Sequence, residues 1–308
     1  MSNYQLIFDA VRHYAEARED HAALIFNNRI TTYGELWQRA NRVANGLSAL
    51  GLQPQSRVAI LTSNNDFFFE IWLGAALGNF VLAPLNARLA PPEVAFIVND
   101  SQAEVLFIDE PFHGLMEDIS GGLTSIRKII SLGAHADWPT YTDWRDSLSP
   151  DQMEETIDPI ETVVQMYTSG TTGFPKGVEL NHASMLACIR SMMGLNAWPP
   201  NEVTLVTAPL FHTAGWAWAS CALQSGGTIV LLSEVTPTAI LDAFEANAVT
   251  QALLVPAVIQ MVLQLPECAT RDFSNLKRML YGASPIPISV LRRAVDTFRC
   301  EFEQGYGL

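Results

Sequence analysis

The sequence is poor in charge, and above all in positive charge. Charged residues make up 16% of its 308 residues, and 18 Lys and Arg stand against 32 Asp and Glu, which gives a formal net charge of −14. A nucleic-acid binder needs a basic face, and a protein held on an anionic membrane by charge needs basic clusters. We therefore expect no nucleic acid and no charged membrane surface among the partners. Any phosphate-bearing ligand must be held by a local site, because the overall field repels it.

Cysteines and long apolar runs are also few. The four cysteines, Cys188, Cys221, Cys268 and Cys300, form no CxxC pair and no zinc-binding spacing. The N-terminus lacks the basic start and the apolar core of a signal peptide. The longest apolar stretch, 71–85, is interrupted by Gly, Asn and Pro, and it is too short to span a bilayer. We expect a cytoplasmic chain without an integral membrane segment, whose cysteines are reduced thiols.

What the sequence does have is a large apolar fraction, 49% of its residues, enough for a sizeable core. The first clear helix begins at Thr32, where Thr32 and Glu35 form a T-x-x-E capping box. After it, continuous Val/Ile/Leu runs alternate with helical patterns. We expect strands at 57–62, 80–84, 104–109 and 127–132, and again at 203–208, 228–232, 251–255, 278–281 and 301–304.

Alternating strands and helices are typical of parallel α/β layers, and two such series occur. We therefore predict an α/β protein of two packed α/β lobes. Lobe A spans about 52–180, and lobe B spans about 1–51 plus 181–308. Between the two series, the stretch 133–161 carries eight acids and one base, Arg145. Its acids show no ligand spacing, so a solvated surface connection is favoured over a metal or partner site.

The most informative segment is Tyr167-Thr-Ser-Gly-Thr-Thr-Gly-Phe-Pro-Lys-Gly177, which follows the apolar strand expected at 162–166. Such a loop can aim backbone N–H groups and hydroxyls into one concavity, to which Lys176 adds a positive charge, as a polyphosphate site requires. A P-loop NTPase is excluded, because Pro175 stands where the second glycine belongs and Gly177 where the magnesium-binding hydroxyl belongs. An ordinary hairpin turn rich in Ser, Thr and Gly is the structural alternative.

The same segment resembles the signature loop of the adenylate-forming enzymes, which include acyl-CoA synthetases, luciferases and peptide-synthetase adenylation domains. Other segments agree with the family in chain order: Thr32-Tyr-Gly-Glu-Leu36 with Asn41-Arg-Val-Ala44, Pro209-Leu-Phe-His-Thr-Ala-Gly215, Tyr281-Gly-Ala-Ser-Pro285 and Gln304-Gly-Tyr-Gly307. The resemblance covers nearly all 308 residues. It implies the two-lobed fold of an AMP-binding N-terminal domain, in part, ending before the family's β-barrel and C-terminal domain.

The resemblance also implies a reaction. The family joins a carboxylate to the α-phosphate of ATP, releases pyrophosphate, and then passes the acyl group to a thiol such as that of CoA. The substrate carboxylate is itself the nucleophile, so no activated Ser, Cys or His is needed, and catalysis depends on positioning and charge stabilisation. ATP, Mg²⁺ and CoA are therefore expected with the small-molecule acid.

The site residues follow from the same resemblance. The β- and γ-phosphates are assigned to Thr168, Ser169, Gly170, Thr171, Thr172, Gly173 and Lys176, with Thr168 also assigned to the magnesium ion. Adenine is assigned to Gly282, Ala283, Ser284, Gly305, Tyr306 and Gly307, with the Tyr306 ring stacked on the base. The acyl and CoA pocket is assigned to His212, Trp216, Val255 and Pro256. A catalytic role for His212 stays open, and for Trp216 an acyl-tunnel wall and core packing are equal alternatives.

The predicted function is an ATP-dependent acyl-CoA synthetase. A fatty acid is the leading substrate, because the small and aromatic residues at 214–220 suit an apolar acyl group. An aryl-acid CoA ligase and a non-catalytic nucleotide- or acyl-binding remnant are the alternatives. The family continues after Leu308 with a magnesium-binding Glu, a ribose-binding Asp and a domain that carries a catalytic Lys. We therefore predict that residues 1–308 alone do not make acyl-CoA.

Overall fold

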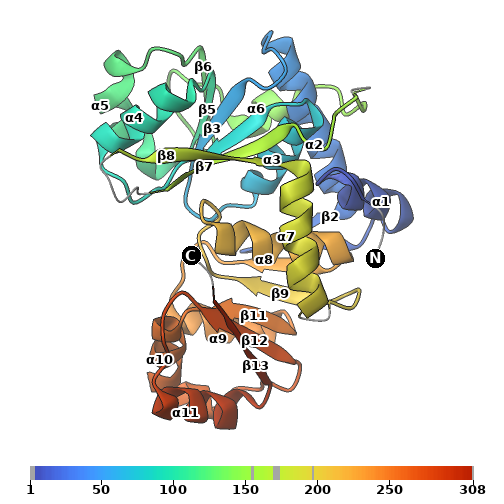
Figure 1. Ribbon diagram of the computed structural model, residues 1–308, viewed down its shortest axis with the longest axis vertical. Coiled ribbons are helices and arrows are strands. Elements are labelled where there is room, and N and C mark those ends of the chain that lie inside the picture. The colour runs from blue at the N-terminus through green and yellow to red at the C-terminus, as the bar shows by residue number, and fades with distance from the viewer. Residues whose placement is uncertain (1–3, 154–155, 169–173, 196–197, 307–308) are drawn as a thin grey trace.

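A computed structural model describes residues 4–153, 156–168, 174–195 and 198–306 of the chain. In this part of the chain the strands form two sheets, one of six strands and one of seven (Figure 1). Both are mainly parallel, and helices cover them. The predicted class, two packed α/β units, is confirmed.

The six-stranded sheet has the order β6-β5-β3-β4-β7-β8. Only the pairing of β8 with β7 is antiparallel. The strands are β3 (Arg57–Leu61), β4 (Val81–Pro84), β5 (Val105–Ile108), β6 (Lys128–Ser131), β7 (Thr162–Thr168) and β8 (Lys176–Asn181), and the helices between them are α3 (Phe67–Leu77), α4 (Pro91–Ser101), α5 (His113–Ile119) and α6 (Tyr141–Asp146).

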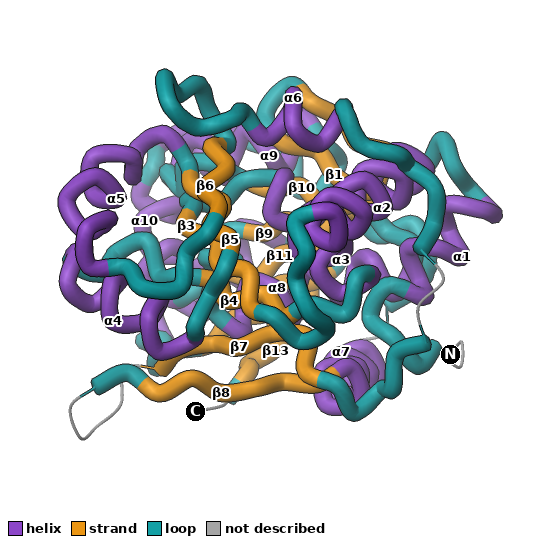
Figure 2. Tube along the Cα trace, turned by 90° about the horizontal axis from the view of Figure 1, so that it is seen from above, coloured by secondary structure: helices purple, strands orange, loops and turns teal. Residues whose placement is uncertain are grey.

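Successive side chains along these strands enter different cores, as a pleated strand buried on both faces requires. Val58 and Ile60 of β3 join the core that contains α2 and α3, whereas Ala59 and Leu61 join the core beneath α4 and α5. Figure 2 shows α4 and α5 on one side of this sheet and α2, α3 and α6 on the other. The continuous apolar runs in the sequence thus reflect helices on both faces.

The seven-stranded sheet has the order β13-β12-β11-β9-β10-β1-β2. Only β2 runs antiparallel to its neighbour. The strands are β1 (Ala22–Phe26), β2 (Arg29–Thr32), β9 (Val203–Val206), β10 (Thr228–Leu231), β11 (Gln251–Leu254), β12 (Arg278–Gly282) and β13 (Glu301–Gly305). The helices are α1 (Asp9–Ala17), α2 (Tyr33–Ala49), α7 (His182–Leu195), α8 (Thr213–Ser225), α9 (Pro237–Ala246), α10 (Pro256–Gln264) and α11 (Ile288–Phe298), with 3₁₀ turns η1 (Glu110–Phe112), η2 (Ser120–Gly122) and η3 (Pro266–Thr270) elsewhere in the chain.

The predicted capping box of α2 is present. The Glu35 N–H donates to Thr32 Oγ1 at 3.2 Å, and the Thr32 N–H donates to Glu35 Oε2 at 3.0 Å. From this start α2 packs along α3, and the two backbones approach so closely that a Cβ on Gly74 would lie 2.5 Å from Cβ of Val43. The predicted lobe B places residues 1–51 with the second series of strands. Strands β1 and β2 do pair in that sheet, whereas helix α2 packs against α3 beside the other sheet.

The interpretation of 133–161 as a solvated connection is wrong around α6. Tyr141 and Arg145 of this helix are buried. The Tyr141 hydroxyl and Arg145 Nη1 donate to Glu70 Oε2 of α3 at 2.8 and 2.7 Å. Burial raises the pKa of Glu70, while Arg145 and Arg39 oppose that rise. The one base of the acidic stretch therefore neutralises a buried carboxyl on another helix, a pairing that composition does not reveal.

Among the described residues, none of the helices is long and apolar enough to cross a membrane.

Candidate functional site

The segment expected to bind phosphates joins the two strands of a hairpin. In its last described pairs, Tyr167 of β7 lies opposite Gly177 of β8, and Thr168 lies opposite Lys176. The side chains of Thr168 and Lys176 are exposed, so a hydroxyl and an ammonium group are available where the hairpin ends. The other predicted phosphate ligands, Ser169, Gly170, Thr171, Thr172 and Gly173, lie outside the described residues.

A strand, and not a helix, follows this segment, which agrees with the exclusion of a P-loop NTPase. The antiparallel pairing of β7 with β8 fits the alternative interpretation of this segment, a hairpin connection. It does not compete with a binding role, because exposed groups at the end of a hairpin remain free to meet a ligand.

A chain of hydrogen bonds lies beneath the hairpin. Arg57 Nη2 donates to Glu179 Oε1 of β8 at 2.5 Å, and Arg57 Nε donates to Gln165 Oε1 of β7 at 3.2 Å. Gln165 Nε2 donates to the Tyr167 hydroxyl at 3.2 Å, and that hydroxyl donates to Asp100 Oδ2 of α4 at 2.6 Å. Burial, together with the Asp100 carboxylate, raises the pKa of Tyr167, so the phenol keeps its proton and remains the donor.

Gly177 gives this chain of hydrogen bonds its room. A Cβ on Gly177 would lie 2.5 Å from Gln165 Nε2 and 3.0 Å from Cζ of Tyr167. A larger residue at position 177 would therefore make Gln165 and Tyr167 shift, and would disturb the hydrogen bond between them.

A second segment, 207–215, connects the two sheets. Asn64, which follows β3, accepts a hydrogen bond from the Leu210 N–H at 3.1 Å and donates to the Ala208 carbonyl at 3.3 Å. A Cβ on Gly215 would lie 2.2 Å from the Pro209 carbonyl oxygen, so only glycine fits beside this turn. Asn64 belongs to none of the motifs in the sequence. The one sign of it there is that a polar residue stands just after the carboxyl end of a predicted strand.

His212 stands at the N-cap position of α8 and is exposed. Its ring centroid lies 4.7 Å from that of Phe211. Desolvation of the ring and the charge of Arg88 lower the pKa of His212, so the imidazole is neutral near pH 7. A neutral ring can accept or donate a proton, and its catalytic role stays a prediction.

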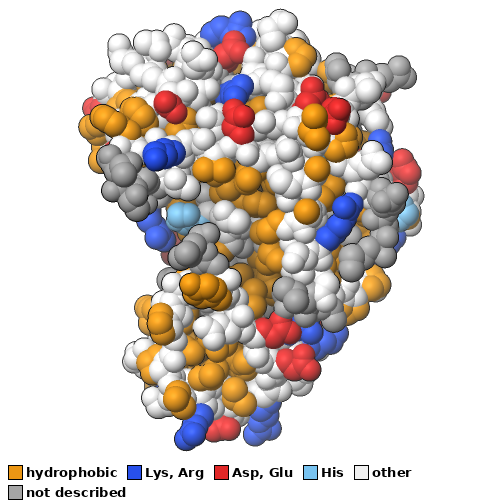
Figure 3. Space-filling model, viewed as in Figure 1, with side chains coloured by type: hydrophobic (Ala, Val, Ile, Leu, Met, Phe, Trp, Pro, Cys, Tyr) orange, Lys and Arg blue, Asp and Glu red, His pale blue; other side chains and the backbone are white. Residues whose placement is uncertain are grey.

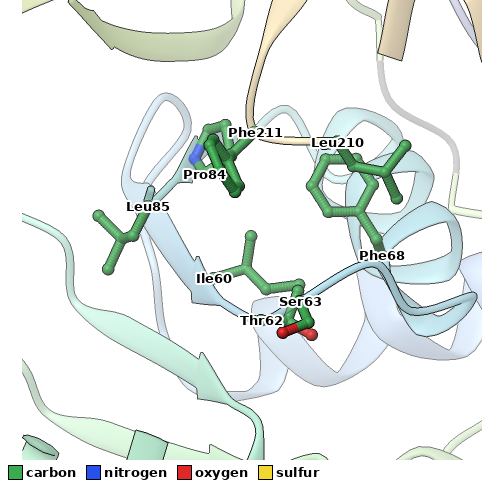
Figure 4. Close-up of a pocket in the computed structure, with 8 residues that line it drawn as sticks. All are labelled: Ile60, Thr62, Ser63, Phe68, Pro84, Leu85, Leu210 and Phe211. Carbon is green, nitrogen blue, oxygen red and sulfur yellow. The ribbon is translucent and has the colours of Figure 1, made fainter. Parts of the chain in front are cut away.

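A small hollow lies where the carboxyl ends of β3 and β4 meet the segment after β9 (Figure 4). It is lined mostly by apolar side chains: Ile60, Thr62, Ser63, Phe68, Pro84, Leu85, Leu210 and Phe211. In this structure the hollow is too narrow to admit a water molecule. It therefore holds neither an acyl group nor a nucleotide unless its walls move.

Trp216, one turn into α8, is 4% exposed. Its Nε1–H points to Met166 Sδ of β7 at 3.0 Å, and its ring centroid lies 6.5 Å from that of Trp72. These contacts describe core packing between α8 and the hairpin strand, and Trp216 does not line the hollow of Figure 4. Trp216 of α8 thus contacts β7 at Met166, two residues before Thr168, which is the first residue of the predicted phosphate site. A wall role for Trp216 stays a prediction.

The two predicted adenine segments are neighbours. Gly282 of β12 pairs with Gly305 of β13, and a Cβ on Gly282 would lie 2.5 Å from the Gly305 carbonyl oxygen. Ala283 follows in the left-handed region with φ +66°. The side chains of Ala283 and Ser284 are exposed, and Tyr306 is 89% exposed, so its ring is free to stack. Gly307 lies outside the described residues.

Val255 and Pro256 lie directly after the carboxyl end of β11, as the predicted adenine residues lie at the ends of β12 and β13. Val255 is half-buried, and Pro256 is buried at the start of α10. Thr207, after β9, donates through Oγ1 to the Leu253 carbonyl of β11 at 3.1 Å, which ties these two strand ends together. The segments after β9, β11, β12 and β13 therefore share one edge of the sheet, the usual location of ligands in parallel α/β folds.

No group of three or more His, Cys, Asp or Glu side chains able to hold a metal ion occurs within the residues that the structure describes. Mg²⁺ in nucleotide sites is held by one or two carboxylates together with substrate phosphates. The predicted ligand Thr168 supplies one hydroxyl. The assignment of Thr168 to the magnesium ion stays a prediction.

Three comparisons bear on this arrangement. The family model described as "AMP-binding enzyme" matches residues 11–308. A fatty acid–acyl-carrier-protein ligase of Streptomyces coeruleorubidus is 33% identical over 310 residues, which cover 99% of this chain and 58% of that protein. A feruloyl-CoA synthase of Amycolatopsis sp is 34% identical over 279 residues, which cover 90% of this chain and 54% of that protein.

A solved structure, the inhibitor-bound N-terminal domain of FACL13 from Mycobacterium tuberculosis, matches with a TM-score of 0.93 at 27% identity. The match covers 99% of this chain and 76% of that chain. The chain thus spans little more than half the length of these two curated relatives.

Proposed function

Because the chain belongs to the AMP-binding enzyme family, we propose that it is the N-terminal part of an ATP-dependent acyl-CoA synthetase. The resemblance found in the sequence is confirmed by the family match over residues 11–308. The relatives above are acid ligases that differ in the acid named. The activity of the whole protein, its acid and its thiol acceptor are our proposals.

One observation carries the proposal. Each segment assigned to a ligand lies at or just after the carboxyl end of a strand that has a parallel neighbour: Thr168 ends β7, the turn at 209–215 follows β9, Val255 follows β11, Ala283 follows β12 and Tyr306 follows β13. Figures 1 and 2 place the C-terminal end of the chain on the same side of the molecule as the hairpin of β7 and β8. Parallel sheets bind nucleotides at such edges.

The proposed first step balances as a substitution at phosphorus. A carboxylate oxygen of the acid forms a bond to the α-phosphorus of ATP, the bond from that phosphorus to the bridging oxygen breaks, and pyrophosphate leaves. In the second step, the sulfur of CoA bonds to the acyl carbon, its proton passes to solvent, and AMP leaves. Thr168 and Lys176 would hold the outer phosphates, and Lys176 would offset their charge. Mg²⁺ would be bound by the phosphates of the nucleotide.

We propose a fatty acid as the substrate. Apolar side chains lie beside the 207–215 segment, among them Phe68, Leu85 and Leu210, and their chemistry suits a hydrocarbon group. The relative named as a fatty acid ligase supports the same class. The similarity to a feruloyl-CoA synthase favours an aryl acid as the second candidate. A non-catalytic remnant that only binds nucleotide or acyl groups stays the alternative to both.

We also propose the lobe division at about 52–180 against 1–51 plus 181–308. The separate sheets support it, because β1 and β2 pair with strands that follow residue 200. Helix α2 belongs to lobe B by its residues, and it packs against α3 of lobe A. A cytoplasmic location stays a prediction.

The deciding experiment measures ATP–pyrophosphate exchange by the complete gene product with a panel of fatty and aryl acids. We expect acid-dependent exchange that is fastest with a fatty acid. Exchange with aryl acids alone would select the second candidate. ATP binding with no exchange for any acid would contradict an enzyme and select the remnant.

A further inference from the structure

The Asn64 side chain connects the two sheets. Asn64 lies between β3 of the six-stranded sheet and α3, and its amide contacts the segment that follows β9 of the seven-stranded sheet. The Leu210 N–H donates to Asn64 Oδ1 at 3.1 Å, and Asn64 Nδ2 donates to the Ala208 carbonyl at 3.3 Å. One side chain therefore bonds a carbonyl and an N–H that lie two residues apart, as a residue of a parallel strand does.

The polar residues next to Asn64 have partners on the side of the six-stranded sheet or at its edge. Asn65 Oδ1 accepts a hydrogen bond from the Phe67 N–H at 3.0 Å, at the start of α3. Asp66 forms an ion pair with Arg29 of β2. The Asn64 amide instead reaches the backbone at 208–210, so the chain between β3 and α3 presents one side chain to the segment after β9.

The backbone that Asn64 contacts leads directly into the turn that carries His212. The His212 N–H donates to the Pro209 carbonyl at 3.1 Å, and the Gly215 N–H donates to the His212 carbonyl at 3.0 Å. The turn is closely packed, because a Cβ on Gly215 would lie 2.2 Å from the Pro209 carbonyl oxygen. A shift of the backbone at 208–210 would therefore pass to Phe211 and His212.

We propose that Asn64 is a positioning residue, which holds the backbone at 208–210 against the end of β3 and so sets where Phe211 and His212 stand in the acyl pocket. Position is decisive in such a site, because a displacement of about 1 Å can lower a rate roughly a hundredfold. The connection between the sheets rests on the contacts alone. Its consequence for the acid rests on the proposed function.

Apolar packing is the structural alternative. Leu210 is 2% exposed and Phe68 of α3 is 3% exposed, and both belong to the same core and line the narrow hollow of Figure 4. If this packing alone held the turn, removal of the Asn64 amide would lower the stability of the protein and leave the backbone at 208–215 as well protected as before.

Asn45 provides a matched control. Its side-chain Nδ2 donates to the carbonyls of Ser149 and Asp151 at 2.9 and 2.8 Å, which joins α2 to the segment after α6. Asn45 and Asn64 are both half-buried, and each contacts two backbone groups of a distant segment. Asn45→Ala therefore removes a similar pair of hydrogen bonds at a place that has no part in the proposed acyl pocket.

Two measurements test the proposal. Amide hydrogen exchange on the 308-residue chain follows peptides that cover residues 207–217. ATP–pyrophosphate exchange by the complete gene product gives the KM for the fatty acid and the KM for ATP. We expect Asn64→Ala to speed amide exchange in these peptides about tenfold and to raise the KM for the acid about fivefold, with the KM for ATP unchanged. Asn45→Ala should change none of these values.

Asn64→Asp is a second variant of nearly the same size, so it leaves no cavity if Asn64→Ala proves too unstable to fold. A carboxylate cannot donate to the Ala208 carbonyl. Asn64→Asp should therefore also speed amide exchange and raise the KM for the acid. A loss of folded protein alone would lower kcat and leave both KM values unchanged, so the KM for the acid separates positioning from stability.

The outcomes separate the inference from the function on which it draws. Equal amide exchange in both Asn64 variants and the wild-type chain overturns the connection and leaves apolar packing to hold the turn. Faster amide exchange with an unchanged KM for the acid, or equal changes in Asn45→Ala, overturns the positioning role. If the complete gene product shows no acid-dependent exchange, the proposed function fails and the positioning role with it, whereas amide exchange still decides whether Asn64 holds the turn.

Discussion

Gly282 and Gly305 lie directly opposite each other on β12 and β13, so close that a Cβ on Gly282 would stand 2.5 Å from the Gly305 carbonyl oxygen. Two glycines from predicted adenine segments thus allow two backbones to meet at the edge of the sheet. The residues that follow the pair, Ala283 and Tyr306, therefore leave two neighbouring strands at the same edge of the sheet, where we propose that the nucleotide binds.

Gly282→Ala should therefore separate the ends of β12 and β13. Overpacking of this kind costs roughly 1–3 kcal/mol of unfolding free energy. Urea unfolding should show that loss, and AMP binding to the chain should weaken with it. Gly121→Ala is the control, because no heavy atom would lie within 4 Å of the added carbon. Equal stability and AMP affinity in the two variants would mean that the glycine contact is irrelevant to the site.

Lys176→Ala and Thr171→Val should each weaken adenylate formation in the complete enzyme. Loss of a charge-assisted hydrogen bond to a phosphate costs about 1.5–3 kcal/mol, or roughly ten- to a hundredfold in rate. ATP–pyrophosphate exchange at saturating fatty acid measures the effect. Lys128→Ala on β6 provides a control for the loss of one positive charge. Wild-type exchange in both loop variants would remove these residues from the phosphate site.

Trp216→Ala tests the two interpretations of this buried side chain. If Trp216 closes the acyl pocket, the preferred acid should become longer or bulkier, since one methylene contributes roughly 1 kcal/mol in an apolar pocket. Trp218→Ala, equally buried on the same helix, controls for the loss of packing. The measurement is exchange rate against acyl chain length. A stability loss in both variants with an unchanged chain-length profile would leave Trp216 as core packing.

His182 should make stability depend on pH. Burial lowers its pKa to about 4, and Nδ1 accepts a hydrogen bond from the Ile7 N–H at 3.2 Å. The unfolded chain takes up this proton near pH 6.5, and the fold takes it up only near pH 4. Stability should therefore be full above pH 6.5 and fall as the pH drops toward 4.

The lost stability is on the order of 3 kcal/mol. His182→Gln keeps a side-chain acceptor that does not titrate, so it should flatten the curve between pH 6.5 and 4. Urea unfolding at several pH values measures both proteins. Parallel curves for variant and wild type would show that other groups cause the acid sensitivity. His13→Gln serves as a histidine control.

The 308-residue chain alone should not form acyl-CoA. The chain spans little more than half the length of the two curated relatives, so groups that stabilise charge in a whole enzyme can lie outside it, and Lys176 is the positive side chain paired with Thr168 at the hairpin end. Loss of a single preorganised group that stabilises developing charge can lower a rate a hundredfold or more. The chain and the complete gene product should be compared with ATP, magnesium, CoA and a fatty-acid panel. Equal rates would show that the chemistry resides in residues not assigned here.

Local sequence determined the elements and the order of the motifs. The capping box at Thr32 specified the start of α2, because its hydrogen bonds join residues three apart. Continuous apolar runs specified parallel strands covered on both faces, because every side chain of such a strand must leave water. The order of hydroxyls, glycines and one lysine at 167–177 resembles the family's loop, and the family match over residues 11–308 confirms that resemblance.

Tertiary structure decided the partners, because they are far apart in sequence. No local pattern indicates that Arg145 of the acidic stretch donates to Glu70, that Asn64 bonds to Ala208 and Leu210, or that Tyr167 donates to Asp100 of α4. Each of these contacts depends on how strands order themselves in a sheet and how helices pack on it. Sequence periodicity specifies which face of an element is buried, whereas its neighbour follows only from the packing of the whole chain.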